Sequence, residues 1–262
     1  MAKRDRVLTK AKAERRWREG RGQGSGADYQ PWLTIQDVAS IGLSHRAMSS
    51  KTGREHHLLS QNELRYFYLL EWAPTVADIQ EQFPLWHFEE TERIAERLGH
   101  KYPSPPGGVY VMTTDFLITL ANGEKQARTV KQAKEIEKRQ NLIKFDIERE
   151  YWRRRGVEWR IVVAEEIPRD LVENIEWLLP YSDLESTKIS EDDSIQIARR
   201  LTEEMISSED SLADITSRYD AELRMEEGTC LNLCKYMIIN RQWQVDISKR
   251  LSPSKKLVIG RD

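Results

Sequence analysis

The stretch TTDFLITLANGEKQARTVK, residues 113–131, decides the fold of this chain because it predicts a β-hairpin. A β-rich run precedes Asn122-Gly123, a typical turn pair, and a shorter run follows it. The hairpin places Asp115, near the start of the first strand, beside Lys131, at the end of the second. A carboxylate that can hold Mg²⁺, next to an ammonium that can orient water or neutralise phosphate charge, suits metal-assisted hydrolysis of a phosphodiester.

The register of this hairpin decides whether the two side chains share a face of the sheet. A two-residue turn would place Asp115 opposite Val130 and would point Lys131 to the other side. A three-residue loop would instead place Asp115 opposite Thr129 or Lys131, and these side chains would lie on one face. Gly123 suits the left-handed position that such a loop needs. The functional interpretation therefore requires the three-residue loop.

Charge is balanced over the 262 residues but uneven along them. The chain has 41 basic and 43 acidic residues, and its 39% of hydrophobic residues suffices for a real core. Residues 1–23 carry a charge of +6, and such an arm suits nucleic acid, although solvated basic tails are common too. No apolar run approaches the length of a membrane span and no secretory signal is present, so we expect a soluble protein that is not secreted. The basic residues of the arm are Lys3, Arg4, Arg6, Lys10, Lys12, Arg15, Arg16, Arg18 and Arg21.

Three further features resemble binding motifs but favour a structural interpretation. The glycine-rich GRGQGSG at 20–26 has no preceding strand and no following Lys-Ser/Thr, so a flexible lead-in is favoured over a nucleotide site. Cys230 and Cys234 lack two further zinc ligands nearby, which favours buried reduced thiols. The adjacent His56 and His57 cannot both face one site from a strand, so neither is assigned as a ligand.

Glu63 has two competing interpretations. Ser60 begins a predicted helix, SQNELRYFYLLEW, and Glu63 lies three residues later, which is the spacing of a capping box. On the same helix Glu63 shares the buried face with Phe67 and Leu70. A buried carboxylate is costly unless it is compensated, so this placement predicts that Glu63 meets a cation. Both interpretations remain open.

The other elements of the first part follow from periodicity and from turn residues. Residues 38–50 are irregular, and 159–164 form an apolar strand that suits the buried middle of a parallel sheet. The helix before this strand carries Glu148, and the strand–helix–strand order predicts a right-handed crossover beside Lys131. The remaining predictions are a strand over 76–83 that ends at Pro84, an exposed helix over 89–98, and the crossover helix from 136 or 141 to 155.

Composition changes at Pro168, and the second part is mostly helical. The tail from Arg241 alternates weakly, turns near 252–254 and predicts a short basic hairpin, which after helices suggests a winged-helix module. Residues 169–262 carry 19 acidic and 13 basic residues, so a protein-binding role is supported at least as well as DNA binding. The predicted helices cover 171–179, 191–206 with Ser190 as cap, 212–222 and 229–240.

Glu63, Asp115 and Lys131 resemble the loose PD-(D/E)xK signature of the restriction-endonuclease-like superfamily. Longer stretches resemble the TnsA family over residues 19–180, and the C-terminal part resembles it only in layout. We therefore expect an α/β fold with a restriction-endonuclease-like mixed sheet flanked by helices, followed by a mostly helical, winged-helix-like domain. The expected parts are a basic flexible arm (1–26), a catalytic domain (27–168) and a domain for partner and possibly DNA binding (169–262). The stretches are EGRGQGSGADYQPWL at 19–33, SHR at 44–46, KTGREHHLLSQNE at 51–63, EQFPL at 81–85, TTDFL at 113–117 and ENIEWL at 173–178.

The resemblance implies an endonuclease subunit of a heteromeric, Tn7-type transposase. Members of the family cut the 5′ ends of the transposon, while a TnsB-type transposase with an integrase-like catalytic core cuts and joins the 3′ ends. A TnsC-type AAA+ ATPase engages both. The implied cofactor is Mg²⁺, which Mn²⁺ can replace, and the implied partners are transposon-end DNA and these two proteins, with no membrane. The implied location is the bacterial cytoplasm, at the nucleoid during activity.

The resemblance also assigns roles to residues. The helix acid is Glu63, the strand acid Asp115 and the lysine Lys131, with Glu148 as the partner acid of the lysine. At the first position of the (D/E)xK element Thr129 stands where Glu, Asp or, in this family, Gln is usual, and a hydroxyl is a poorer Mg²⁺ ligand. The number of metal ions therefore stays open. The implied metal ligands are Glu63, Asp115, Thr129 and the backbone carbonyl of Val130.

Two other functions and one other role for Glu148 compete with these assignments. Thr129 favours a non-catalytic adaptor that keeps the fold to bridge DNA and the ATPase. A stand-alone repair or junction-resolving nuclease fits the three charged residues but not the longer stretches. Glu148 could also lie on a solvated helix face among Arg149, Glu150 and Arg153, without a specific partner.

Overall fold

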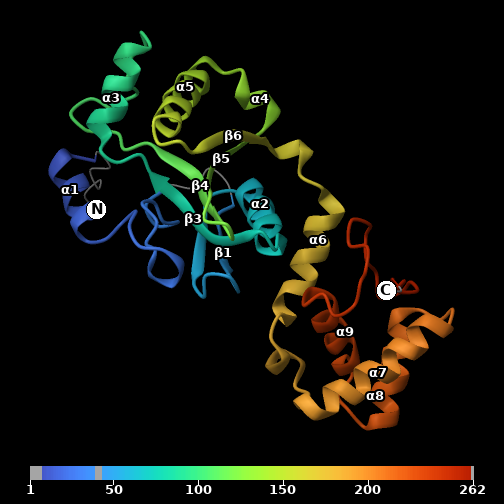
Figure 1. Cartoon of the computed structure of the whole chain (residues 1–262). Coiled ribbons are helices and arrows are strands. Elements are labelled where there is room, and N and C mark those ends of the chain that lie inside the picture. Colours follow the sequence, from blue (N-terminus) through green and yellow to red (C-terminus); the bar gives the residue numbers. More distant parts are fainter. Residues whose placement is uncertain (1–7, 39–42, 261–262) are drawn as a thin grey trace, which may run out of the picture. The chain divides into compact units, whose positions relative to one another are not determined.

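A computed structural model describes residues 8–38 and 43–260, and the chain divides into two compact units, Met1–Ile167 and Pro168–Asp262 (Figure 1). The division falls where the composition changes. Expectations that concern Lys3, Arg4 and Arg6, or residues 39–42, lie outside the described residues.

A four-stranded mixed sheet forms the centre of the first unit (Figure 1). Its first three strands pair antiparallel, and the last two pair parallel across the crossover helix. The predicted α/β class with a mixed sheet is confirmed. The last strand was predicted in the middle of the sheet, but among the described strands only one pairs with it, so it forms an edge. The strands, in sheet order, are β3 (Val76–Pro84), β4 (Thr113–Leu120), β5 (Lys125–Lys131) and β6 (Glu158–Val163).

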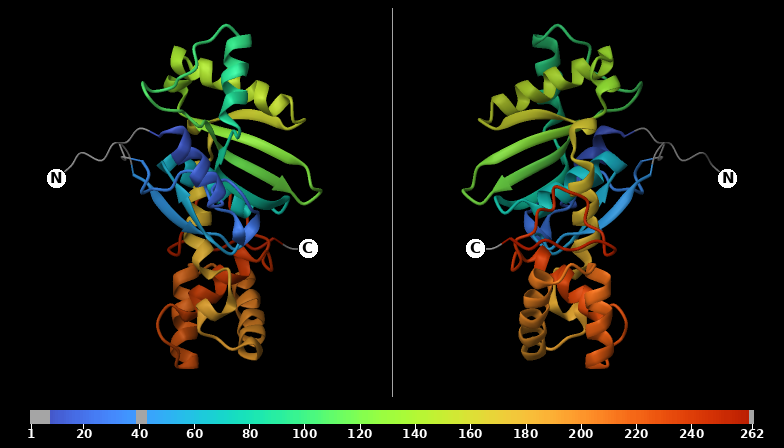
Figure 2. Two further views of the ribbon diagram at one scale, coloured as in Figure 1. Left: turned by 90° about the vertical axis from the view of Figure 1, so that its left-hand side faces the viewer. Right: turned by 90° about the vertical axis from the view of Figure 1, so that its right-hand side faces the viewer.

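Helices cover both faces of this sheet. On one face Phe116 of β4 contacts Tyr66 of α2 at 5.6 Å between ring centroids. On the other face Leu117 of β4 shares an apolar cluster with Ile147 and Trp152, and α3 and α5 pack against each other there (Figure 2). The helix expected to be exposed is therefore half buried. The helices are α2 (Gln61–Trp72), α3 (Phe88–Arg97), α4 (Ala133–Ile136) and α5 (Arg139–Arg153), and the short η2 (Ala164–Glu166) follows β6.

The β4–β5 hairpin has the three-residue loop that the functional interpretation requires. Leu120 N–H donates to the Glu124 carbonyl at 2.8 Å, and Gly123 between them has φ +85°. Leu117 pairs with Ala127, and both lie in the apolar cluster with Ile147 of α5, whereas Phe116 pairs with Arg128. The ladder ends at this pair, and beyond it the two strands part towards Asp115.

From residue 8 onward the N-terminal segment forms a helix and a packed loop, where the sequence predicts a flexible arm. Helix α1 (Lys10–Arg18) buries Ala13 completely. The glycine-rich loop lies against β3, where the Gln80 side-chain amide donates to the Gly24 carbonyl at 2.8 Å. Gly22 has φ +76°, and a Cβ there would lie 2.2 Å from Pro84 Cγ, so only glycine fits.

A two-stranded antiparallel sheet has its first strand within 38–50, where the sequence predicts irregular structure. It consists of β1 (His45–Met48) and β2 (Glu55–Leu58). Local propensity misses it because four-residue strands depend on their pairing and on the packing of α2 against them. The short η1 (Gly26–Asp28) precedes it.

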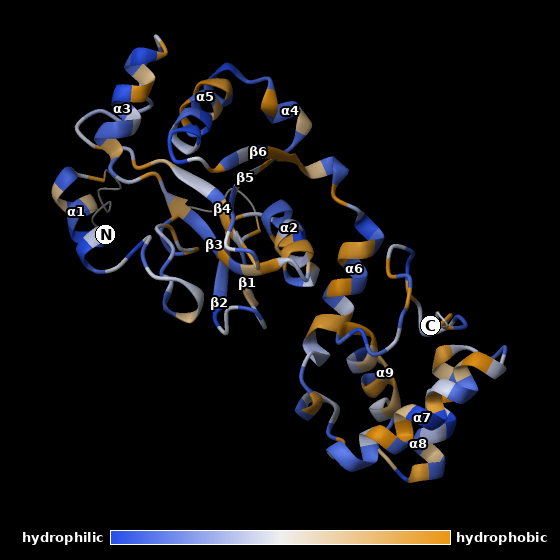
Figure 3. Cartoon of the chain, viewed as in Figure 1, coloured by the Kyte–Doolittle hydropathy of each residue, from blue (hydrophilic) through white to orange (hydrophobic). Residues whose placement is uncertain are grey.

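The second unit is helical, and its predicted helices are confirmed (Figure 3 shows apolar residues along each). Ser190 caps the longest of them by accepting from Asp193 N–H at 3.2 Å. Cys230 and Cys234 are fully buried free thiols, as predicted, and burial raises the pKa of both. No described helix is long and apolar enough to cross a membrane. The helices are α6 (Arg169–Leu178), α7 (Glu191–Ser207), α8 (Leu212–Leu223) and α9 (Thr229–Ile239), with the short η3 (Leu179–Tyr181) and η4 (Leu184–Thr187).

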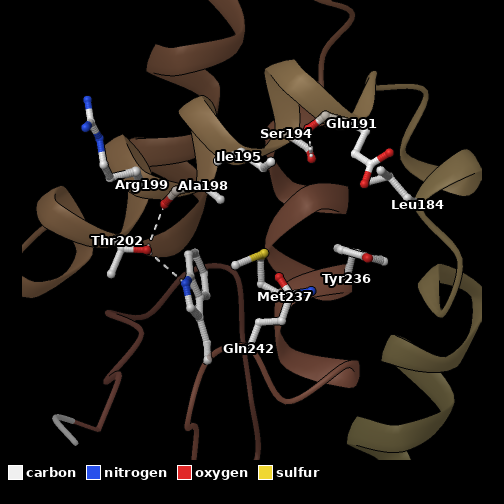
Figure 4. A pocket seen from close by; sticks show the side chains of 11 residues that line it. Leu184, Glu191, Ser194, Ile195, Ala198, Arg199, Thr202, Tyr236, Met237 and Gln242 are labelled. Carbon is white, nitrogen blue, oxygen red and sulfur yellow. Dashed lines mark hydrogen bonds between the residues drawn. The ribbon is translucent and has the colours of Figure 1, made fainter.

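The tail does not form the predicted basic hairpin. Within 241–260 the structure has no strand, so the hairpin of a winged helix is absent from the described tail. Backbone hydrogen bonds and side-chain packing hold the tail instead, and Gly260 N–H donates to the Gln244 carbonyl at 2.7 Å. Trp243 donates its indole N–H to the Thr202 hydroxyl at 2.9 Å and, with Tyr236 and Met237, lines a groove of about 530 Å³ (Figure 4).

Candidate active site

Asp115 and Lys131 meet where β4 and β5 part. Lys131 Nζ donates to Asp115 Oδ2 at 3.1 Å, and Val130 N–H donates to the same oxygen at 2.8 Å. The Asp115 side chain thus bridges the gap between the strands. Its other oxygen, Oδ1, accepts no hydrogen bond from the described residues. The two side chains remain 11% and 28% exposed, so solvent and a substrate can reach them.

Glu63 caps α2 and is buried, as both interpretations require, but it forms no ion pair with a cationic side chain among the described residues. The Ser60 hydroxyl accepts from Glu63 N–H at 3.2 Å and lies 2.9 Å from Glu63 Oε1, while Leu59 N–H donates to Oε2 at 3.0 Å. The side chain caps α2, yet it is buried at 6% exposure. Burial, together with the negative charge of Asp115, raises the pKa of Glu63 to about 7.

Lys131 is the positive charge of the site. Burial disfavours its ammonium, but the carboxylates of Asp115 and Glu63 outweigh that effect and hold the pKa of Lys131 above its ordinary value. The lysine therefore stays charged at neutral pH, as a group that neutralises phosphate must.

Glu148 lies on the buried face of α5, and its hydrogen-bond partners differ from those that the sequence predicts. The Thr129 hydroxyl donates to Glu148 Oε2 at 2.6 Å, and the Trp159 indole N–H donates to the same oxygen at 2.9 Å. Burial, reinforced by the charge of Asp115, raises the pKa of Glu148 to about 7. Lys131 pairs with Asp115 instead, and no ion pair joins Lys131 to Glu148 in the described part of the chain. The solvated-face alternative is also wrong.

Sequence reasoning missed two residues of the site, Gln82 and Trp159. Gln82 donates its side-chain amide to Glu63 Oε2 at 3.2 Å and accepts from the Thr113 hydroxyl at 2.9 Å. It lies in β3 with φ +48°, a left-handed conformation that costs energy for a residue with a side chain. The available signal for Gln82 was the polar run Gln80-Glu81-Gln82, which interrupts the apolar residues of the strand.

A second buried charge cluster, the Arg54 cluster of Arg54, His56 and Glu81, lies beside this site. The Arg54 guanidinium forms two hydrogen bonds with the Glu81 carboxylate, at 2.5 and 2.9 Å, and His56 Nδ1 lies 2.8 Å from Glu81 Oε2. Burial would raise the pKa of Glu81, but the bonds from Arg54 and His56 outweigh it and lower that pKa to about 2. His56 is thus engaged with Glu81, in agreement with leaving it unassigned as a metal ligand.

The donor set suits a hard divalent cation that keeps several waters. No group of three or more His, Cys, Asp or Glu side chains could hold a metal among the described residues. Glu63 and Asp115 nevertheless offer carboxylate oxygens, and the charge of Asp115 raises the pKa of Glu63, a repulsion that a cation would relieve. Mg²⁺ prefers oxygen ligands and commonly binds through one or two carboxylates together with water and phosphate.

A carboxylate and a lysine at parting strands of a mixed sheet, with a second buried carboxylate on α2, suit a nuclease, and similarity to known proteins supports that class. Residues 73–164 match the TnsA-like endonuclease N-terminal family, and residues 166–247 match the TnsA endonuclease C-terminal family. The chain belongs to the TnsA endonuclease family. It is 37% identical over 257 residues, 97% of this chain and 93% of the relative, to the transposon Tn7 transposition protein TnsA of Escherichia coli. Asp115, Lys131 and Glu148 lie inside the first match, and Glu63 precedes it.

Proposed function

We propose that this chain is the Mg²⁺-dependent DNA endonuclease subunit of a Tn7-type heteromeric transposase and cuts the 5′ ends of the transposon during excision. The observation that carries the proposal is the pairing of Asp115 with Lys131 at the parting strands. Burial and, after it, the charge of Asp115 raise the pKa of the Glu63 carboxyl to about 7, which supports it. Membership of the TnsA family and the relative named for Tn7 transposition support it.

Each residue has a defined role in this proposal. Asp115 and Glu63 hold the cation, which Mn²⁺ can replace, with the Thr129 hydroxyl and the Val130 carbonyl as further oxygen donors. When bound, the metal polarises the scissile phosphate and lowers the pKa of a bound water. Lys131 turns from Asp115 to the phosphate and neutralises the charge that develops there.

The proposal extends to partners. Transposon-end DNA is the substrate, and a TnsB-type transposase and a TnsC-type AAA+ ATPase complete the complex in the bacterial cytoplasm. The basic N-terminal part, residues 1–26, contacts DNA, the part over 27–168 cuts it, and the part over 169–262 binds a partner protein. Support for the last assignment is the excess of acidic over basic residues there, which disfavours a broad DNA surface.

The test is 5′-strand cleavage of transposon-end DNA in the presence of both partner proteins and Mg²⁺. We expect wild type to cut and Asp115→Ala to lose activity on the order of 10³-fold, because an anchoring carboxylate of the metal is gone. Glu150→Ala is the matched control, since this acid lies on α5 and, in the described part of the chain, forms its ion pairs with the exposed Arg153 and Arg154.

One observation favours a second function. Thr129 offers no carboxylate of its own, as a non-catalytic adaptor would tolerate. The adaptor predicts equal cleavage by the complex with wild type and with Asp115→Ala. A stand-alone nuclease predicts cutting by the chain without either partner. Either result would contradict the proposal.

A further inference from the structure

Thr129 leaves the (D/E)xK element without an acid, and Glu148 lies directly behind it. The Thr129 hydroxyl donates to Glu148 Oε2 at 2.6 Å, a length typical of a strong hydrogen bond to a charged acceptor. Both side chains are buried, at 3% and 4% exposure. Water therefore does not compete for this bond, and the low local dielectric strengthens it.

The direction of the bond matters for the cation. A hydroxyl has one proton and two lone pairs; Thr129 donates the proton to Glu148 and accepts from the Trp159 indole N–H with one lone pair, so Oγ1 keeps one lone pair for a cation. Donation to a carboxylate polarises the hydroxyl and makes its oxygen more negative. Thr129 also shares a strand face with Lys131, and the charge of Glu148 acts on Lys131. The negative charge that position 129 lacks is thus supplied from α5.

Trp159 fixes the Glu148 carboxylate. Its indole N–H donates to Glu148 Oε2 at 2.9 Å and lies 3.2 Å from Thr129 Oγ1. Its position is set by β6, which runs parallel to β5 and pairs Trp159 with Ala127. The ring packs against Phe145 of α5 at 5.9 Å between centroids. The donor is therefore held between the strand and the helix that carry the other two groups.

We propose that Thr129 and Glu148 together replace the acidic residue of the (D/E)xK element, and that Trp159 positions Glu148 for this role. Thr129 supplies the ligand oxygen, and Glu148 supplies the charge through the hydrogen bond. Glu148 and Trp159 are thus positioning residues that act through Thr129. The inference rests on the proposed function, because it assigns ligands to the cation of that site.

The first test measures the affinity of the full chain for Mn²⁺ by calorimetry. Its variants remove the carboxylate from α5 and then place one on β5 instead. Glu148→Gln keeps the shape but removes the charge, and we expect it to weaken Mn²⁺ binding about 10- to 100-fold. Thr129→Asp combined with Glu148→Gln restores one acid at position 129, and we expect it to recover most of the original affinity. Unchanged affinity in Glu148→Gln, or no recovery in the double variant, would overturn the proposal.

A second pair of variants separates positioning from stability. Trp152 also donates a buried indole N–H to a threonine hydroxyl, that of Thr114, at 2.8 Å. Trp152→Phe removes one buried indole hydrogen bond and Trp159→Phe removes the bonds to Glu148 and Thr129, so both variants should lose thermal stability. Only Trp159→Phe should weaken Mn²⁺ binding. Equal Mn²⁺ affinities in the two variants would count against a positioning role for Trp159.

Failure of this inference is distinguishable from failure of the proposed function. The same variants are assayed for 5′-strand cleavage with both partner proteins, and Asp115→Asn marks the binding that belongs to the site. Wild type that binds Mn²⁺ through Asp115 but never cuts would refute the proposed function alone. Wild type that cuts, with Glu148→Gln equal to it in both assays, would refute the inference alone. Equal Mn²⁺ binding by wild type and Asp115→Asn, or no binding by either, would also refute the inference.

Discussion

Two consecutive residues of β3 contact two different clusters of buried charge, and the pKa values of the carboxyl groups in these clusters are shifted in opposite directions. Glu81 of β3 belongs to the Arg54 cluster, and its pKa is lowered to about 2. The next residue, Gln82, bonds with Glu63 of what we call the Asp115 cluster, made up of Glu63, Asp115, Lys131 and Glu148. There the pKa values of Glu63 and Glu148 are raised to about 7.

The balance of charge explains the difference. In the Arg54 cluster one carboxylate receives two bonds from a guanidinium, a third bond from the His57 amide, and the contact with His56. In the Asp115 cluster, among the described residues, Lys131 forms an ion pair with Asp115, and its charge also acts on Glu63 and Glu148. A satisfied buried charge serves the fold, whereas a cluster short of positive charge suits a cation or a substrate from outside.

The largest expected effect is on catalysis by the Asp115 cluster. Lys131→Ala and Glu63→Ala should each reduce 5′-strand cleavage on the order of 10³-fold, because transition-state charge loses its stabilisation. Both variants should stay folded, although Glu63→Ala should also lose about 1 kcal/mol of stability with its helix cap. The measurement is cleavage by the complete complex, with circular dichroism as the check on folding. Wild-type cleavage by either folded variant would contradict this role.

The next effect concerns stability and belongs to the Arg54 cluster. Arg54→Ala leaves Glu81 buried without its partner and should lower the free energy of unfolding by about 3–5 kcal/mol. Arg46→Ala is the matched control, because Arg46 forms an exposed ion pair with Glu55 at 3.5 Å. Such pairs contribute about 0–1 kcal/mol. Denaturant unfolding measures the free energy of unfolding of both variants. Equal losses in Arg54→Ala and Arg46→Ala would contradict a structural role for the Arg54 cluster.

Acid should weaken the Arg54 cluster in a defined pH window. Glu81 has a folded-state pKa of about 2 against an ordinary value of 4.5, so its contribution is fully present above pH 4.5. That contribution disappears as pH falls from 4.5 towards 2, because the unfolded state takes up the proton first. The stability difference between wild type and Glu81→Gln should shrink over this window, as measured by denaturant unfolding at each pH. A difference that stays constant would show that Glu81 is not held charged by Arg54.

The smallest expected effect is on DNA binding by α1. Lys12 and Arg18 are exposed and form no ion pair among the described residues. Replacing both with alanine should weaken DNA binding several-fold and flatten its salt dependence by about 0.9 in log–log slope for each phosphate that the variant no longer neutralises. Point variants are preferable to deletion of 1–18, since deletion would also remove the buried Ala13. An unchanged slope would argue against DNA binding by α1.

Sequence reasoning succeeded where local chemistry decides the structure. Asn122-Gly123 sets the loop and hence the register that joins Asp115 to Lys131, and Ser60 with Glu63 sets the start of α2. It failed where distant segments compete. The partner of Glu148 depends on the packing of α5 over Thr129 and on Trp159 from the edge strand, which no local pattern encodes. The prediction of a hairpin in the tail was wrong for the same reason, because Trp243 bonds to Thr202 of α7, which is distant in the sequence.

The most direct test of the claim that the Asp115 cluster, unlike the Arg54 cluster, binds a cation is to measure the unfolding temperature at increasing MgCl₂ concentrations. The ionic strength is kept constant with NaCl. Our account predicts that Mg²⁺ raises the unfolding temperature of wild type, because a ligand that binds only the folded state stabilises it. Asp115→Asn should show a much smaller rise, since this variant relieves the repulsion with Glu63 and lacks the anchoring carboxylate. An equal response to Mg²⁺ in wild type and Asp115→Asn would contradict the claim that the Asp115 cluster holds the metal.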